Sequence, residues 1–163
     1  MRIILGVDPG TRVTGYAVIK CLPGGSYEIL DFGCIRPPPE LPLAERYLVI
    51  FNAIEHLIEK FKPEAVSVET QFMSKNAQST MKLSIARGTV MLAAAKNKVT
   101  VHEYTPRKAK QAIVGNGNAS KEQIQRMLQI LLKLPKLPEP EDAADALALA
   151  ICHAHMLKRL SYV

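Results

Sequence analysis

Three short runs of strand-forming residues open the chain. The first run, residues 2–8, places Ile3, Leu5 and Val7 on one face and ends at Asp8. The other runs cover residues 14–20 and 27–35, with turns rich in Pro and Gly at residues 9–11 and 23–25. Alternation with a period of two is typical of β-strands, and Pro and Gly mark the turns between them. The pattern therefore predicts an antiparallel meander of three strands.

The rest of the chain switches between helical and strand patterns. Apolar residues at three- and four-residue spacing predict a helix over residues 43–61, which Lys62-Pro63 ends. Further helices are predicted over residues 75–96, 106–115, 120–132 and 141–159, and further strands over residues 64–69 and 99–104. The order βββαβαβααα is typical of an α/β fold. We expect a five-stranded mixed sheet flanked by helices, in a single domain over residues 1–163.

Positive charge gathers in the middle of the chain. The net charge is +6, and residues 70–138 contain 12 Lys or Arg but two acids, whereas the remainder contains 9 basic and 13 acidic residues. A basic middle between acidic parts favours a polyanion-binding surface beside a carboxylate cluster. A solvated lysine-rich surface would give the same composition, so charge alone leaves both interpretations open.

Cysteine spacing and hydropathy indicate the cellular compartment of the protein. Cys21, Cys34 and Cys152 are far apart and form no C-x-x-C pair, which favours reduced thiols over a disulfide framework or a zinc site. The first apolar run is too short for a signal peptide, and the other apolar stretches are too short to span a bilayer. We therefore expect a cytoplasmic protein without membrane contact.

Four acids occupy positions where α/β sheets build their sites. Asp8 and Glu69 end two predicted strands, and Asp142 and Asp145 share one face near the start of the last helix. Carboxylate oxygens are the ligands that Mg²⁺ prefers, and two such ions can drive phosphodiester hydrolysis. Each acid alone has a structural explanation in a turn or a first helical turn. Together, the four favour a metal-dependent nuclease whose carboxylates repel one another until cations bind.

Four segments in order along the chain carry recognisable motifs. The first two are residues 4–16 and residues 69–76. The third contains Lys82-Leu83, Ala86-Arg87-Gly88, Lys110-Gln111 and Val114-Gly115, and the last covers residues 142–148. Over roughly residues 3–155 these segments resemble the opening motif, second signature, middle and closing motif of the RuvC family of Holliday-junction resolvases. The resemblance implies an RNase H-like fold and an endonuclease that resolves four-way DNA junctions by paired symmetric nicks, in homologous recombination and DNA repair.

The resemblance also implies roles for individual residues. Asp8, Glu69, Asp142 and Asp145 would be catalytic ligands of two Mg²⁺ ions, for which Mn²⁺ can substitute; some relatives carry His where Asp142 stands. Phe72 matches an aromatic that stacks at the opened junction centre, and Lys110 and Lys121 match basic residues near the scissile phosphate. Looser candidates for phosphate contact are Arg12, Lys75, Arg107 and Lys108. For Phe72 the structural alternative is a core residue, and for the two lysines it is an exposed helix face.

A homodimer is implied as well, with RuvA and RuvB as partners. The helix over residues 75–96 is the candidate interface, because Ser84 and Gly88 would allow close approach, with Met81, Ile85 and Leu92 beside them. The alternative is that this stripe faces the core of its own subunit.

Three histidines also need an interpretation from the sequence. We interpret His102, His153 and His155 as surface or helix-end residues, although His153 could face the acids.

Residues 6–11 also resemble the phosphate loop of actin-like and sugar-kinase ATPases, but 163 residues leave no room for the second domain that those enzymes need. A non-catalytic junction-binding module is disfavoured by the four acids, which would weaken DNA binding without cations.

Overall fold

The structure is a computed structural model that describes residues 1–70 and 75–161. Its strands are β1 (Arg2–Asp8), β2 (Thr14–Cys21), β3 (Tyr27–Ile35), β4 (Ala65–Glu69) and β5 (Thr100–Tyr104). Its helices are α1 (Leu43–Phe61), α2 (Ala77–Lys96), α3 (Pro106–Val114), α4 (Lys121–Leu131) and α5 (Glu141–Ser161), with a short 3₁₀ turn, η1, at Pro23–Gly25. The element order is the predicted one, and the boundaries differ by about two residues at most, as helix ends fray.

The sheet has the strand order β3-β2-β1-β4-β5. The β1–β2 and β2–β3 pairs are antiparallel, whereas the β1–β4 and β4–β5 pairs are parallel. The predicted meander and mixed sheet are therefore both confirmed. Because β1 and β4 are parallel neighbours, Asp8 and Glu69 lie at the same end of the sheet.

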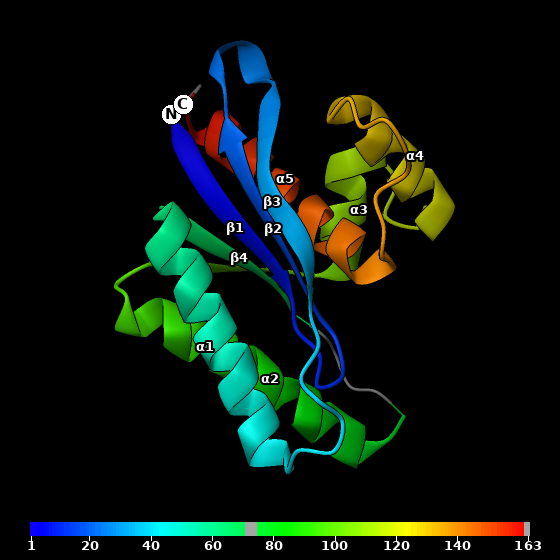
Figure 1. The fold of residues 1–163 in the computed structure, drawn as a ribbon. Helices are drawn as coiled ribbons and strands as arrows, with labels where there is room; N and C mark the ends of the chain where they lie inside the picture. The colour runs from blue at the N-terminus through cyan, green and yellow to red at the C-terminus, as the bar shows by residue number, and fades with distance from the viewer. Residues whose placement is uncertain (71–74, 162–163) are drawn as a thin grey trace.

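Helices cover both faces of this sheet (Figure 1). On one face, α1 and α2 pack against apolar side chains such as Leu5, Val7 and Val66. On the other face, α5 lies along β1 and β2, with α3 and α4 beyond it. No helix within residues 1–70 and 75–161 is long and apolar enough to cross a membrane.

Two glycines let α5 approach the sheet closely. A methyl group added at Gly6 would overlap the carbonyl oxygen of Ala146 and lie 3.0 Å from the Cβ of Ala150. At Gly15 it would overlap the carbonyl oxygen of Asp142. The backbones of β1 and β2 therefore contact α5 directly. This contact fixes the distance between Asp142 and the sheet.

Candidate active site

Three of the four predicted acids meet at one point. The carboxylate oxygens of Asp8, Asp142 and Asp145 can all lie within 4.8 Å of one another. Glu69 contributes to the same site, because its side chain hydrogen-bonds that of Asp8. The acids open into a hollow of about 330 Å³ between the sheet, α3, α4 and α5. It is lined by Asp8, Glu69, Pro106, Ala109, Lys110, Lys121, Ile124, Asp142, Asp145 and Ala148.

The electrostatics of this cluster are unfavourable without a cation. Burial, followed by the charges of Glu69 and Asp145, raises the pKa of Asp8 to about 9. Burial and the charge of Glu69 likewise raise the pKa of Asp145 to about 6, although Lys121 opposes this shift. A carboxyl in such surroundings disfavours its charged form. The repulsion expected from the sequence is therefore present.

Two lysines face the acids across the hollow. Lys110 comes from α3 and is half-buried, whereas Lys121 begins α4 and is exposed. The ammonium of Lys121 lies 2.9 Å from a carboxylate oxygen of Glu141, and this hydrogen bond raises the pKa of Lys121. Lys121 therefore stays protonated, so both positive charge and carboxylate oxygens converge on one concave surface.

The donor set fits a hard divalent cation. The described cluster offers carboxylate oxygens and neither thiolate nor imidazole, which is the chemistry that Mg²⁺ and Mn²⁺ prefer. Cations placed among these oxygens would relieve the repulsion that raises the pKa of Asp8. The repulsion among the acids and the ligand chemistry thus agree on a divalent metal.

Comparison with known proteins decides the family. The family model described as "Crossover junction endodeoxyribonuclease RuvC" matches residues 4–153. A RuvC from Protochlamydia amoebophila is 57% identical over 98% of this chain and 96% of its own. The chain belongs to the RuvC family. It is therefore a crossover junction endodeoxyribonuclease.

Solved structures agree with this assignment. A Thermus thermophilus RuvC in complex with a Holliday junction substrate superposes with a TM-score of 0.93, at 32% identity, over 99% of this chain and 98% of that one. A yeast mitochondrial Holliday junction resolvase superposes with a TM-score of 0.71 over 98% of this chain and 80% of that one. At 15% identity, the yeast protein supports the fold alone. The predicted RNase H-like fold is confirmed by the RuvC structures.

The looser DNA-contact candidates of this RuvC chain lie outside the hollow. Arg12 is exposed in the β1–β2 loop, and Lys75 is exposed just before α2. Arg107 and Lys108 are exposed at the start of α3, where the side chain of Arg107 packs over Gly117 and the ammonium of Lys108 lies 5.4 Å from the centre of the Tyr104 ring. Phe72 lies outside the described residues, so its predicted stacking role stays a prediction.

The interpretation of His153 as a surface or helix-end residue is wrong. His153 is 2% exposed, and its Nδ1 lies 2.7 Å from the hydroxyl of Tyr104. The ring of His102 stacks on it, with centroids 4.2 Å apart. His153 is not among the residues that line the acidic hollow. His102 and His155 are partly buried, so neither is a fully exposed residue.

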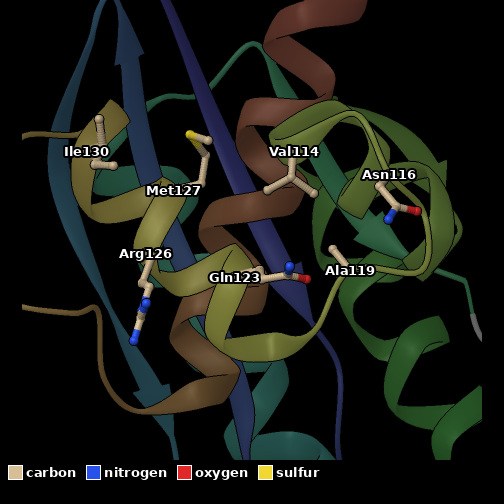
Figure 2. A pocket seen from close by; sticks show the side chains of 7 residues that line it. All are labelled: Val114, Asn116, Ala119, Gln123, Arg126, Met127 and Ile130. Carbon is tan, nitrogen blue, oxygen red and sulfur yellow. The ribbon is translucent and has the colours of Figure 1, made fainter.

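A second hollow of about 400 Å³ lies over α4 and the end of α3 (Figure 2). Its lining residues are Val114, Asn116, Ala119, Gln123, Arg126, Met127 and Ile130. The lining contains no carboxylate, although Arg126 pairs with Glu122 one turn away. The acidic hollow is therefore the site with the chemistry of a nuclease.

Proposed function

We propose that this chain works as a homodimer that resolves four-way DNA junctions by paired symmetric nicks, with two Mg²⁺ ions at each site. The observation that carries the proposal is the convergence of four acids and two lysines on one hollow. The proposed metal ligands are Asp8, Glu69, Asp142 and Asp145, and the proposed phosphate contacts are Lys110 and Lys121. The junction recorded with the Thermus relative supports the choice of substrate.

The side chains have separable tasks in this proposal. When bound, two Mg²⁺ ions would supply the positive charge that activates a water molecule and stabilises the leaving oxygen. The acids of β1, β4 and α5 would hold and orient these ions from three separate parts of the chain. Lys110 and Lys121 bind the scissile phosphate and offset its charge. Arg46 supports the β1–β2 loop after Asp8, because its guanidinium donates to the Thr11 carbonyl at 2.7 Å.

Cleavage of a synthetic four-way junction tests the proposal directly. We expect paired nicks on opposed strands with Mg²⁺, slower nicking of linear duplex, and no nicking with a chelator. Junction binding without cleavage in both Mg²⁺ and Mn²⁺ would point to a non-catalytic binding module. ATP hydrolysis by the purified protein would support the kinase-like alternative.

Replacing the lysines of the hollow should slow the reaction. We expect Lys110→Ala and Lys121→Ala each to lower the cleavage rate by about a hundredfold, as removal of one stabilising donor does elsewhere. Each lost phosphate contact should also reduce the slope of log affinity against log salt by about 0.9. Rates are measured by single-turnover cleavage and slopes by fluorescence anisotropy. Lys136→Ala, an exposed lysine outside the hollow, is the control; unaltered cleavage by both hollow variants would contradict their role.

The proposed dimer uses the outer face of α2. Met81 and Leu92 are each 64% exposed, and Ile85 is 47% exposed. These side chains therefore do not pack into the core of their own subunit, which was the alternative. A two-fold dimer would provide the two active sites that a symmetric junction requires. Apolar side chains that project from one helix face favour burial against a second copy.

Gly88→Arg should produce a folded monomer. A Cβ at Gly88 meets no atom within 4 Å, so a longer side chain fits the isolated subunit but would obstruct close helix approach. Light scattering should show half the parental mass, with an unchanged circular dichroism spectrum. The monomer should nick poorly and without paired timing on opposed strands. Ala44→Arg, on the exposed part of α1, is the control; a Gly88→Arg dimer that cuts both strands in concert would place the interface elsewhere.

Three further expectations stay predictions. The family suggests RuvA and RuvB as partners that present the junction. The hydropathy pattern favours the cytoplasm, and the length favours one domain over residues 1–163.

A further inference from the structure

Tyr104 and His153 form a buried polar pair between β5 and α5. The tyrosine is 6% exposed and the histidine 2% exposed. Burial, followed by the charge of nearby His102, lowers the pKa of His153 to about 4, while burial raises the pKa of Tyr104 to about 12. At neutral pH the imidazole is thus uncharged and the phenol protonated. The Tyr104 hydroxyl and Nδ1 of His153 therefore share a hydrogen bond between two uncharged groups across 2.7 Å.

Tyr104 also lies beside two other parts of the site. These are the end of β4, which carries Glu69, and the start of α3, which carries Lys110. Its Cα pairs with that of Glu69 in the β4–β5 ladder, and its carbonyl oxygen accepts a hydrogen bond from the Thr70 amide at 2.8 Å. One residue later, the side chain of Thr105 caps α3, the helix that carries Lys110. The backbone at Tyr104 is therefore continuous with both the Glu69 strand end and the Lys110 helix.

His153 belongs to the helix that carries the other two acids. Asp145 and His153 are eight residues apart on α5, about 12 Å along the helix axis. An α-helix transmits a rotation or shift along its length, so holding His153 restricts the freedom of Asp142 and Asp145. Because β5 is an edge strand with β4 as its neighbour, its end is held against α5 by the Tyr104–His153 bond together with apolar contacts. The apolar contacts involve Tyr104, Ala109, Leu149 and Cys152.

We propose that Tyr104 is a positioning residue, whose hydroxyl bond to His153 sets Glu69 and Lys110 against Asp142 and Asp145. The bond joins the two halves of the acid cluster, one on the strand ends and the other on α5. This inference rests on the proposed function, since it assumes that the acids bind metal. Groups that hydrogen-bond directly to metal ligands commonly change metal affinity by 10–100-fold, so a bond one step further from the acids should act at the low end of that range.

Tyr104→Phe removes the hydroxyl and leaves the ring in place. We expect its Mn²⁺ dissociation constant, measured without DNA from the free-ion electron paramagnetic resonance signal, to rise about tenfold. The Mg²⁺ concentration for half-maximal junction cleavage should rise by a similar factor. Tyr27→Phe is the matched control: its hydroxyl also joins the sheet to α5, by accepting from Lys158 at 3.1 Å, but at the far end of the helix from the acids. This control should bind Mn²⁺ with parental affinity.

A double variant separates positioning from stability. Tyr104→Phe leaves Nδ1 of His153 buried without its hydrogen-bond partner, which should lower the melting temperature by several degrees. Adding His153→Leu removes both polar groups, so the melting temperature should return toward that of the parent. Because the bond between β5 and α5 is still missing, the raised Mn²⁺ dissociation constant should persist.

The outcomes distinguish this inference from the proposed function. Parental Mn²⁺ affinity in the double variant, or in a folded Tyr104→Phe, would overturn the positioning role while leaving the metal site intact. A parent that binds no Mn²⁺ would instead overturn the proposed function. If Tyr104→Phe alone fails to fold, the double variant decides, since it carries no unpaired imidazole.

Discussion

Asp8→Asn should lower the rate of junction cleavage by at least roughly a thousandfold, equivalent to about 4 kcal/mol of barrier. The substitution keeps the size of the side chain and removes the charge at the centre of the acid cluster. Junction binding should persist or tighten slightly, because one negative charge facing DNA is lost. Single-turnover cleavage and anisotropy measure the two quantities separately. Near-parental cleavage in Mg²⁺ would exclude Asp8 from the metal ligands.

The same variant should be more stable than the parent when no metal is present. The pKa of Asp8 is about 9 in the folded chain and 3.8 in the reference state, so the folded state retains a proton that the unfolded state releases. The stabilisation from this proton is present below pH 3.8 and is lost as the pH rises through about 9. At pH 8 we therefore expect Asp8→Asn to exceed the parent by several kcal/mol in unfolding free energy. Mg²⁺ should reverse the order, because it stabilises the parent by binding.

Asp31→Asn provides the control for both measurements. Asp31 lies on β3 and accepts a weak hydrogen bond from Tyr16 at 3.5 Å, outside the hollow. The same chemical change there should leave the cleavage rate, and the dependence of stability on pH up to 9, close to those of the parent. A stability gain equal to that of Asp8→Asn would show that the effect is not specific to the acid cluster.

Gly15→Ala should destabilise the fold by about 3 kcal/mol or more, as severe overpacking does. The new methyl group would overlap the Asp142 carbonyl oxygen, which is backbone and cannot rotate away. Relief requires α5 to move off the sheet, and Asp142 moves with it. A displacement of about 1 Å at a reacting centre can cost a hundredfold in rate, so cleavage by the folded fraction should also fall.

Gly33→Ala is the matched control for this prediction. It introduces the same methyl group on β3, where the nearest atom is the Tyr16 hydroxyl oxygen at 3.2 Å, at the end of a side chain that can adjust. Urea unfolding of both variants measures the difference in stability. If Gly15→Ala unfolds at the same urea concentration as Gly33→Ala, the close approach of α5 to β2 is not essential.

The acid cluster could be predicted because its signals are local in sequence. Asp8 and Glu69 end runs of strand-forming residues, and the parallel pairing of β1 and β4 brings those ends together. Asp142 and Asp145 share a helix face by spacing alone. The family resemblance then indicated the roles of Lys110 and Lys121, and the structure places both beside the acids. Whether these residues bind metal and phosphate stays a prediction that the variants above test.

The burial of His153 could not be predicted from the same kind of signal. Small and apolar residues occupy nearly all positions from Ala143 to Ala154, and this whole stretch of α5 is buried except at Asp145. A helix without a distinct polar face gives no indication of which way a given histidine points. The partner, Tyr104, is 49 residues away in sequence, so their contact depends on the β4–β5 register and not on spacing. The one sequence signal is that Tyr104 ends a predicted strand, as Asp8 and Glu69 do.

The position of α5 in the chain has a consequence for how the protein is made. A ribosome that has translated as far as residue 140 has produced all five strands and both lysines, but neither Asp142 nor Asp145. The same nascent chain lacks the helix that covers β1 and β2, so the apolar face of its sheet is still open to water. The acid cluster and the core are thus completed by the same segment. Chains that stop short of this helix, through premature termination or proteolysis, therefore lack both a closed core and two of the four acids.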